Sequence, residues 1–194
     1  MGKRSFFPRL ALVNLVRNSR YYGPYLLSCG ALAAMYYILR FLTWNEVIQT
    51  VRGAAYLQVM MSIGCFVVAL FSTVLLLYAN SFVMKRRQKE LGLYNILGLE
   101  KRHIAALCFW ETLLCAAVVI PGGIAAGILL SKLILLLLLK LVQIPVQFGF
   151  SVSVRGVGET AVLLGVLFLL ALLWNLLRLG RSRPIELLHS DSAG

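Results

Sequence analysis

The sequence TAVLLGVLFLLALLWNLL, from Thr160 to Leu177, contains no charged residue and is apolar along nearly its whole length. A helix needs about 20 mostly apolar residues to cross the hydrocarbon core of a bilayer. Toward the N-terminus, three more charge-free apolar runs occur at residues 21–39, 53–84 and 112–131. The sequence therefore predicts an all-α protein that crosses a membrane four times.

The composition agrees with a multi-pass membrane protein and excludes the soluble classes. Of the 194 residues, 60% are hydrophobic and only 13% are charged, whereas a soluble domain has about 25% charged residues. The formal net charge of +12 would suggest nucleic acid as the partner of a soluble chain. Here the basic residues flank the apolar runs, so we expect anionic lipids and no nucleic acid.

The third apolar region is longer than one span requires. It runs from residue 104 to residue 139 and contains only two charged residues, Glu111 and Lys132. Pro121, Gly122 and Gly123 interrupt it, which permits either one long kinked helix or a hairpin of two short spans.

The distribution of basic residues decides between these alternatives. The segments 1–20, 81–103 and 178–194 carry 14 of the 19 lysines and arginines. Because positive residues collect on the cytoplasmic side of membrane proteins, both termini and the middle loop are predicted to lie there. An even number of spans meets this condition, so the third region is predicted to be one long kinked helix.

The predicted organisation follows from these runs and charges. Its segments are a basic cytoplasmic N-terminal helix (1–20), a first span (21–42), a second span (56–84), a cytoplasmic loop (85–103), a long kinked third span (104–139), an outer loop (140–157), a fourth span (158–178) and a cytoplasmic tail (179–194).

The loop between the second and third spans reads KRRQKELGLYNILGLEKRH, from Lys85 to His103. Leu91, Tyr94 and Leu97 recur at helical spacing, which predicts a short amphipathic helix that Gly98 can end. Such a helix, flanked by basic residues, is typical of an anchor at the membrane surface. It is equally suited to be a lever that another protein grips.

Glu111 is the one carboxylate well inside a predicted span. An intramembrane acid is costly and usually faces protein or water. It could be a gate or an ion-coupling group, or a hydrogen-bonded packing residue between helices. We favour the packing role, because a single acid without a charged partner is a poor relay.

Small residues in the third span predict helix packing. Gly123 and Gly127 have the small-xxx-small spacing that allows helix backbones to approach closely, and Gly30 and Ala34 repeat it in the first span. Pro121 and Gly122 complete the group of residues expected to serve in kinking or packing the third span.

The chain contains no motif for catalysis, cofactor binding or metal binding. No GxxxxGK[ST] phosphate loop is present, and the four cysteines form no CxxC pair. The two histidines have no serine or carboxylate partner at helical spacing. We therefore expect no enzymatic activity and no bound cofactor in this chain.

Three stretches together resemble the FtsX-like permease family of bacterial ABC transporters, and within it the bacitracin-export, BceB-type permeases. The first is RQKELGL, from Arg87 to Leu93, followed by Ile96-Leu97-Gly98. The second is Phe109-Trp110-Glu111 with the glycines at 122, 123 and 127, and the third is RSRPIELL at residues 181–188. Their order and spacing make the resemblance fairly specific.

The resemblance implies a partner ATPase that holds ATP and magnesium, and a multi-pass location in the bacterial cell membrane. It also implies that the loop docks on this ATPase as a coupling helix, through Glu90, Leu91, Gly92, Leu93, Tyr94, Leu97 and Gly98. BceB-type members serve in resistance to peptide antibiotics, often alongside a sensor histidine kinase. Because these permeases continue into further spans and a large extracellular domain, this chain resembles their N-terminal four-span unit, as a fragment or a split subunit. The remaining spans or a second permease copy would be further partners.

The sequence leaves two other classes of protein open. A four-span accessory or signalling protein that binds anionic lipid without transport would show the same charge asymmetry. A membrane-embedded enzyme would need paired polar groups at one depth, which Glu111 alone does not supply.

Overall fold

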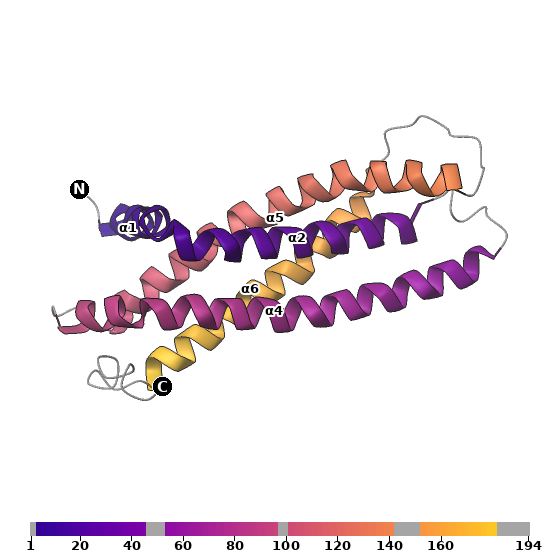
Figure 1. Ribbon diagram of the computed structural model, residues 1–194. Helices are drawn as coiled ribbons and strands as arrows, with labels where there is room; N and C mark the ends of the chain where they lie inside the picture. Colours follow the sequence, from indigo (N-terminus) through magenta and orange to yellow (C-terminus); the bar gives the residue numbers. More distant parts are fainter. Residues whose placement is uncertain (1–2, 46–52, 97–100, 142–151, 182–194) are drawn as a thin grey trace. The chain divides into compact units, whose positions relative to one another are not determined.

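The computed structural model describes residues 3–45, 53–96, 101–141 and 152–181. Within these residues every regular element is a helix and no strand occurs (Figure 1). The helices are α1 (Lys3–Arg17), α2 (Ser19–Thr43), α4 (Ala54–Ile96), α5 (Lys101–Leu141) and α6 (Val154–Arg181).

Four of these helices are long and apolar enough to cross a membrane, which confirms the predicted all-α, four-span class. The segments that meet this condition are Ser19–Thr43, Ala54–Arg87, Arg102–Leu138 and Val154–Leu179.

A small polar residue or a glycine precedes the start of each of the helices α2, α4 and α6. The Asn18 carbonyl accepts hydrogen bonds from the amides of Tyr21 and Tyr22 at 3.0 and 3.2 Å, so α2 starts immediately after α1 ends. Gly53 precedes α4 with φ near +89°, a left-handed conformation that glycine adopts at low cost. The Ser153 hydroxyl accepts a 3.1 Å hydrogen bond from the Gly156 amide and caps α6.

The helices contribute to two compact units. The first unit comprises the described parts of Met1–Leu26, Leu75–Ala117 and Val166–Gly194. The second unit comprises the described parts of Leu27–Val74 and Val118–Gly165.

The first unit brings together the start of α2, the end of α4, the start of α5 and the end of α6 (Figure 1). This is the arrangement that four spans of alternating direction require. Part of its interior is an apolar contact in which Ile104 and Cys108 of α5 pack against Met84 of α4 and Leu179 of α6.

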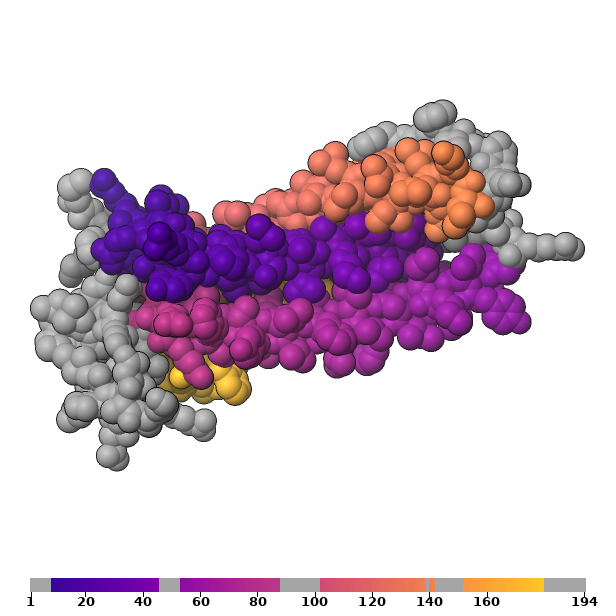
Figure 2. Space-filling model, in the orientation of Figure 1, coloured from indigo at the N-terminus to yellow at the C-terminus, as the bar shows by residue number. Residues whose placement is uncertain are grey.

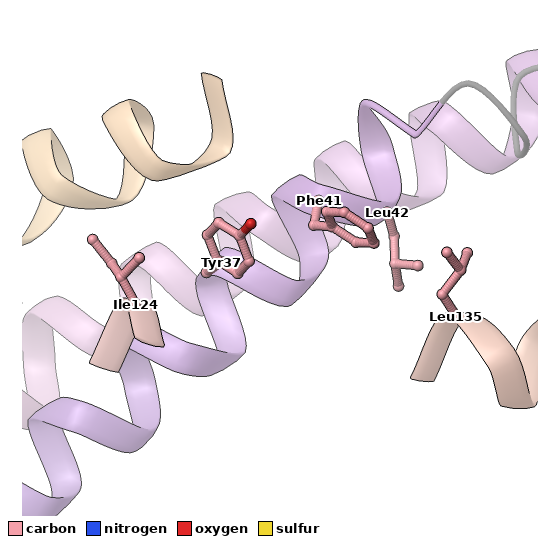
Figure 3. Packing of buried hydrophobic residues seen from close by; sticks show 5 residues of the cluster. All are labelled: Tyr37, Phe41, Leu42, Ile124 and Leu135. Atoms are coloured by element: carbon pink, nitrogen blue, oxygen red, sulfur yellow. The ribbon is translucent and has the colours of Figure 1, made fainter. Parts of the chain in front are cut away.

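The second unit has an apolar core made mainly by α2 and α5 (Figure 3). Tyr37, Phe41 and Leu42 project from α2 toward Ile124 and Leu135 of α5. The rings of Tyr37 and Phe41 are stacked with their centroids 6.2 Å apart. Because lipid tails are as apolar as these side chains, close packing and not exclusion from water stabilises this contact in a membrane.

Two glycines of α5 permit this close approach to α2. A Cβ atom added at Gly123 would overlap the Ala33 side chain and lie 3.0 Å from the Gly30 carbonyl oxygen. At Gly127 it would lie 3.1 Å from the Ala34 Cα. The two small-xxx-small pairs of the sequence therefore face each other, and helices α2 and α5 run in the same direction. Gly122, by contrast, has no atom of another element within 4 Å of such a Cβ.

Helix α4 presents a broad apolar face that no other described helix covers (Figure 2). Large side chains along it are 40–82% exposed, which is the composition expected of a surface that faces lipid. These residues are Tyr56, Leu57, Val59, Met60, Ile63, Phe66, Val67, Leu70, Phe71, Val74, Leu75, Tyr78 and Phe82.

The structure differs from the sequence prediction at the end of the second span. We expected this span to end at residue 84 and to be followed by a loop with its own short helix, but α4 continues without a break to Ile96. Lysine and arginine are good helix formers, so the basic run at 85–89 changes the polarity of the helix without ending it. Residues 97–100 lie outside the described part of the chain.

The third span is a single helix. Helix α5 runs from Lys101 to Leu141 through Pro121, which excludes the hairpin of two short spans.

Candidate functional site

A buried polar network in the first unit centres on Glu111 of α5. The residue is only 4% exposed, and its carboxylate forms an ion pair with the guanidinium of Arg87, which is 2% exposed and lies on α4. Both charges are thus removed from solvent and from lipid. A buried charge is tolerated when it is paired and hydrogen-bonded, and this pair meets the first condition.

Two further side chains complete the network, which we call the Glu111 network (Asn14, Tyr22, Arg87 and Glu111). The Tyr22 hydroxyl accepts a 2.7 Å hydrogen bond from Arg87 Nη1 and donates to Glu111 Oε2 over 3.4 Å. Asn14 Nδ2 donates to Glu111 Oε1, also over 3.4 Å. The carboxylate therefore receives donors from three elements, α1, α2 and α4.

Local structure places each of these groups. Asn14 and Tyr22 lie on either side of Asn18, where α1 ends and α2 begins, so this junction aims both side chains at α5. On α4, Arg87 belongs to a stripe of buried residues at helical spacing, together with Leu76, Asn80 and Val83.

On α5, the stripe of Ile104, Cys108, Glu111 and Cys115 has the same spacing, and all four residues are buried. The two stripes bring Arg87 and Glu111 together across the contact between α4 and α5.

This arrangement corrects the expectation that Glu111 has no charged partner. Arg87 is 24 residues away in the sequence. The charge-free run ends at Met84, which predicts that Arg87 lies in a loop. The signal that could have identified it is the helical spacing of residues 76, 80, 83 and 87, which continues the buried stripe past the first basic residues. Tyr22 and Asn14 carry no comparable signal.

A second polar contact lies in the same unit. The side-chain amides of Asn80 on α4 and Asn175 on α6 form reciprocal hydrogen bonds of 2.9 and 3.1 Å. This pair is uncharged, so it joins α4 to α6 without the desolvation cost of ions. Between the pair and Glu111 lies a cavity of about 20 Å³, whose lining also includes Tyr22 and Thr112. A polar cavity of this size can hold one water molecule.

The second unit contains a separate charged cluster at the end of α2 and the start of α6. Glu159 forms ion pairs with Arg40 and, at 3.2 Å, with Arg155. The Arg155 guanidinium lies 3.7 Å from the centre of the Trp44 ring, and that of Arg40 lies 5.9 Å from it. Arg155 is 64% exposed, so this cluster is much less buried than the Glu111 network.

Part of the Glu111 network lies in a region of the sequence that is shared with a known protein family. The family model for the FtsX-like permease C-terminal region matches residues 62–184, which is more than half of the chain. The chain belongs to the FtsX-like permease family. The matched region of this permease includes Arg87 and Glu111, whereas Asn14 and Tyr22 precede it.

Three curated relatives of the permease come from two bacteria. Its sequence is 30% identical over 171 residues to the bacitracin export permease protein BceB of Bacillus subtilis, and 28% identical over 188 residues to the BceB protein of Halalkalibacterium halodurans. It is 25% identical over 183 residues to the uncharacterized ABC transporter permease YvcS of Bacillus subtilis. These matches cover 86%, 95% and 93% of the chain.

The chain spans only about a quarter of the length of these relatives, with 26% to 28% of each relative matched. Together with the four apolar helices, the family assignment makes this a multi-pass protein of the bacterial cell membrane.

The residues predicted to meet an ATPase lie beside the Glu111 network along the chain of this permease. Residues 90–94 belong to the last part of α4, but their side chains lie outside the described residues. Leu97 and Gly98 lie outside them altogether. The docking role of this segment therefore stays a prediction.

The residues predicted to kink or pack the third span lie in different surroundings. Gly123 and Gly127 lie at the contact between α2 and α5, Gly122 faces open space, and Pro121 is inside α5. Among the described residues, no group of three or more histidine, cysteine, aspartate or glutamate side chains could hold a metal ion.

Proposed function

We propose that this chain is a transmembrane permease subunit of an ABC transporter, or the N-terminal part of one. It couples ATP hydrolysis by a partner ATPase to a conformational change of the spans, and nucleotide chemistry belongs to the partner. The observation that carries this proposal is the family match over residues 62–184, which includes the end of α4, the start of α5 and the connection between them.

The geometry favours α4 as the coupling element. Because α4 is one helix from Ala54 to Ile96, the segment that follows the second span is a continuous helical extension of that span. A force applied near Ile96 acts directly on the membrane-spanning part of the same helix. A separate helix joined by a flexible loop would transmit such a force less well.

The proposed orientation places the first unit at the cytoplasmic side, with both termini inside. Support comes from the basic segments 1–20, 81–103 and 178–194, whose described residues belong to this unit. In this orientation the end of α4 faces the compartment in which a partner hydrolyses ATP.

We assign peptide antibiotics as the substrate class, for export or resistance. Support comes from the two relatives whose names refer to bacitracin export. Further permease spans or a second permease copy, a sensor histidine kinase and anionic lipids are proposed as additional partners.

Co-purification with the ATPase subunit tests the coupling role. The wild-type chain should retain the ATPase from detergent-solubilised membranes. The Leu93→Asp, Tyr94→Asp variant should lose most of it, because two charges enter an apolar contact.

Lys85→Gln, Arg86→Gln is the control for this experiment. These changes remove basic groups that attract anionic lipid and should leave the ATPase bound. Unchanged co-purification by the Leu93, Tyr94 variant would contradict the docking role.

A further inference from the structure

Helix α4 carries Arg87 nine residues before its last described residue, Ile96. At 1.5 Å per residue this is a distance of about 13 Å along one unbroken helix. The proposed coupling segment comprises residues 90–98, of which 90–96 belong to α4. Arg87 is therefore the last buried residue of α4 that the structure describes before this segment begins. Any displacement of that segment reaches this side chain through the helix itself.

The contacts of Arg87 lead to two other helices. Its guanidinium is ion-paired with Glu111 on α5 and donates to the hydroxyl of Tyr22 on α2 over 2.7 Å. Glu111 in turn accepts from Asn14 on α1. One side chain thus connects the end of the second span to the starts of the first and third spans.

A buried ion pair is suited to transmit displacement because its separation is expensive. Moving Arg87 away from Glu111 would leave two uncompensated charges inside a protein and a membrane. Moving the start of α5 together with the end of α4 keeps the charges paired. The neutral Asn80–Asn175 pair, which joins α4 to α6, lacks this property.

We propose that Arg87 and Glu111 are positioning residues that transmit movement of the coupling segment from α4 to α5, with Tyr22 extending the connection to α2. This inference rests on the proposed function, since it specifies how an ATPase at the end of α4 acts on the spans. It assigns the intramembrane acid a role in coupling and gives Arg87 a role beyond neutralising it.

The test uses the full chain bound to its ATPase and compares three variants. Arg87→Gln, Glu111→Gln removes both charges but keeps hydrogen-bonding side chains of suitable length. Arg87→Glu, Glu111→Arg reverses the pair, and the Tyr22 hydroxyl and Asn14 amide can both donate and accept in the reversed network. Glu159→Gln makes the same carboxylate-to-amide change in the charged cluster of the second unit and is the matched control.

ATP hydrolysis by the bound ATPase is the first readout. The neutral double variant should bind the ATPase normally but lose stimulation by the chain by about tenfold, a coupling effect of ordinary size. The reversed pair should recover most of the stimulation, and Glu159→Gln should behave as wild type. Full stimulation by the neutral variant would overturn the proposal, as would failure of the reversed pair when that variant still inserts and binds.

A second readout needs no partner. Spin labels at Phe82 and Phe109, which are exposed on α4 and α5, report the distance between the two helices in lipid nanodiscs. The wild-type chain should give a narrow distance distribution, and the neutral variant a broader one. Distance distributions of equal width in the wild-type chain and the neutral variant would overturn the proposal, whether or not the ATPase binds the wild-type chain. Failure of the ATPase to bind the wild-type chain would contradict the proposed function.

Discussion

Glu111 and Arg87 show how the environment of one residue depends on another that is distant in the sequence. Each is almost completely buried, and each neutralises the charge of the other. Removing one partner of a buried pair costs about 3–5 kcal/mol, because the other charge stays behind, whereas removing both is often nearly neutral. The pair therefore makes the effect of a single substitution larger than that of a matched double substitution.

We predict that Glu111→Gln alone lowers the free energy of unfolding by several kcal/mol, about the cost of an unpaired buried guanidinium. The double variant Arg87→Gln, Glu111→Gln should recover most of this loss. Denaturant unfolding in mixed micelles measures both values. A double variant that is less stable than the single variant would contradict the assignment of the ion pair.

At the scale of helices, the contact between α2 and α5 depends on the absence of side-chain atoms at two positions. Gly123 and Gly127 lie against Gly30, Ala33 and Ala34, so the two backbones approach closely. Close approach is the main source of helix association in a membrane, where apolar burial contributes little.

We predict that Gly123→Ala reduces stability by about 1–3 kcal/mol, because the added methyl group overlaps Ala33 and forces the helices apart. Gly122→Ala is the matched control. It adds the same methyl group one residue earlier into open space and should be neutral or slightly stabilising. Thermal unfolding in detergent compares the two variants, and equal losses would mean that the close contact does not hold α2 and α5 together.

The helices also show what the sequence can and cannot predict. Spans were predictable because charge-free runs such as 160–177 are long enough to cross a bilayer. The small-xxx-small spacing indicated that Gly123 and Gly127 serve in helix packing, but it did not indicate that they face Gly30 and Ala34. The end of α4 was not predicted, since the basic residues at 85–87 end the apolar run but do not end the helix. The Glu111 network required contacts between α1, α2, α4 and α5, and helical spacing within one element cannot supply these.

For the whole molecule, the distribution of charge sets the proposed orientation. The three most basic segments have their described residues in the first unit, and the second unit holds the end of α2, the start of α4, the end of α5 and the start of α6. With this orientation, the end of α4 and both termini are cytoplasmic.

Cysteine accessibility tests the orientation in intact cells. Single cysteines at Val16, Asn95 and Val152, in a variant with the four native cysteines replaced, should react with a membrane-impermeant maleimide only at position 152. Val16 is 70% exposed and Val152 is 39% exposed, so both sites can react where the reagent reaches them. Reaction at position 16 or 95 from outside would contradict the proposed orientation.

The proposed function requires that an ATPase acts on the spans through the end of α4. Site-specific photocrosslinking in the membrane can locate this contact, with a photoreactive amino acid at Tyr94 and, as the control, at Val152. We expect a covalent adduct with the ATPase from position 94 and none from position 152. An ATPase that co-purifies with the chain but crosslinks from position 152 and not from position 94 would contradict it.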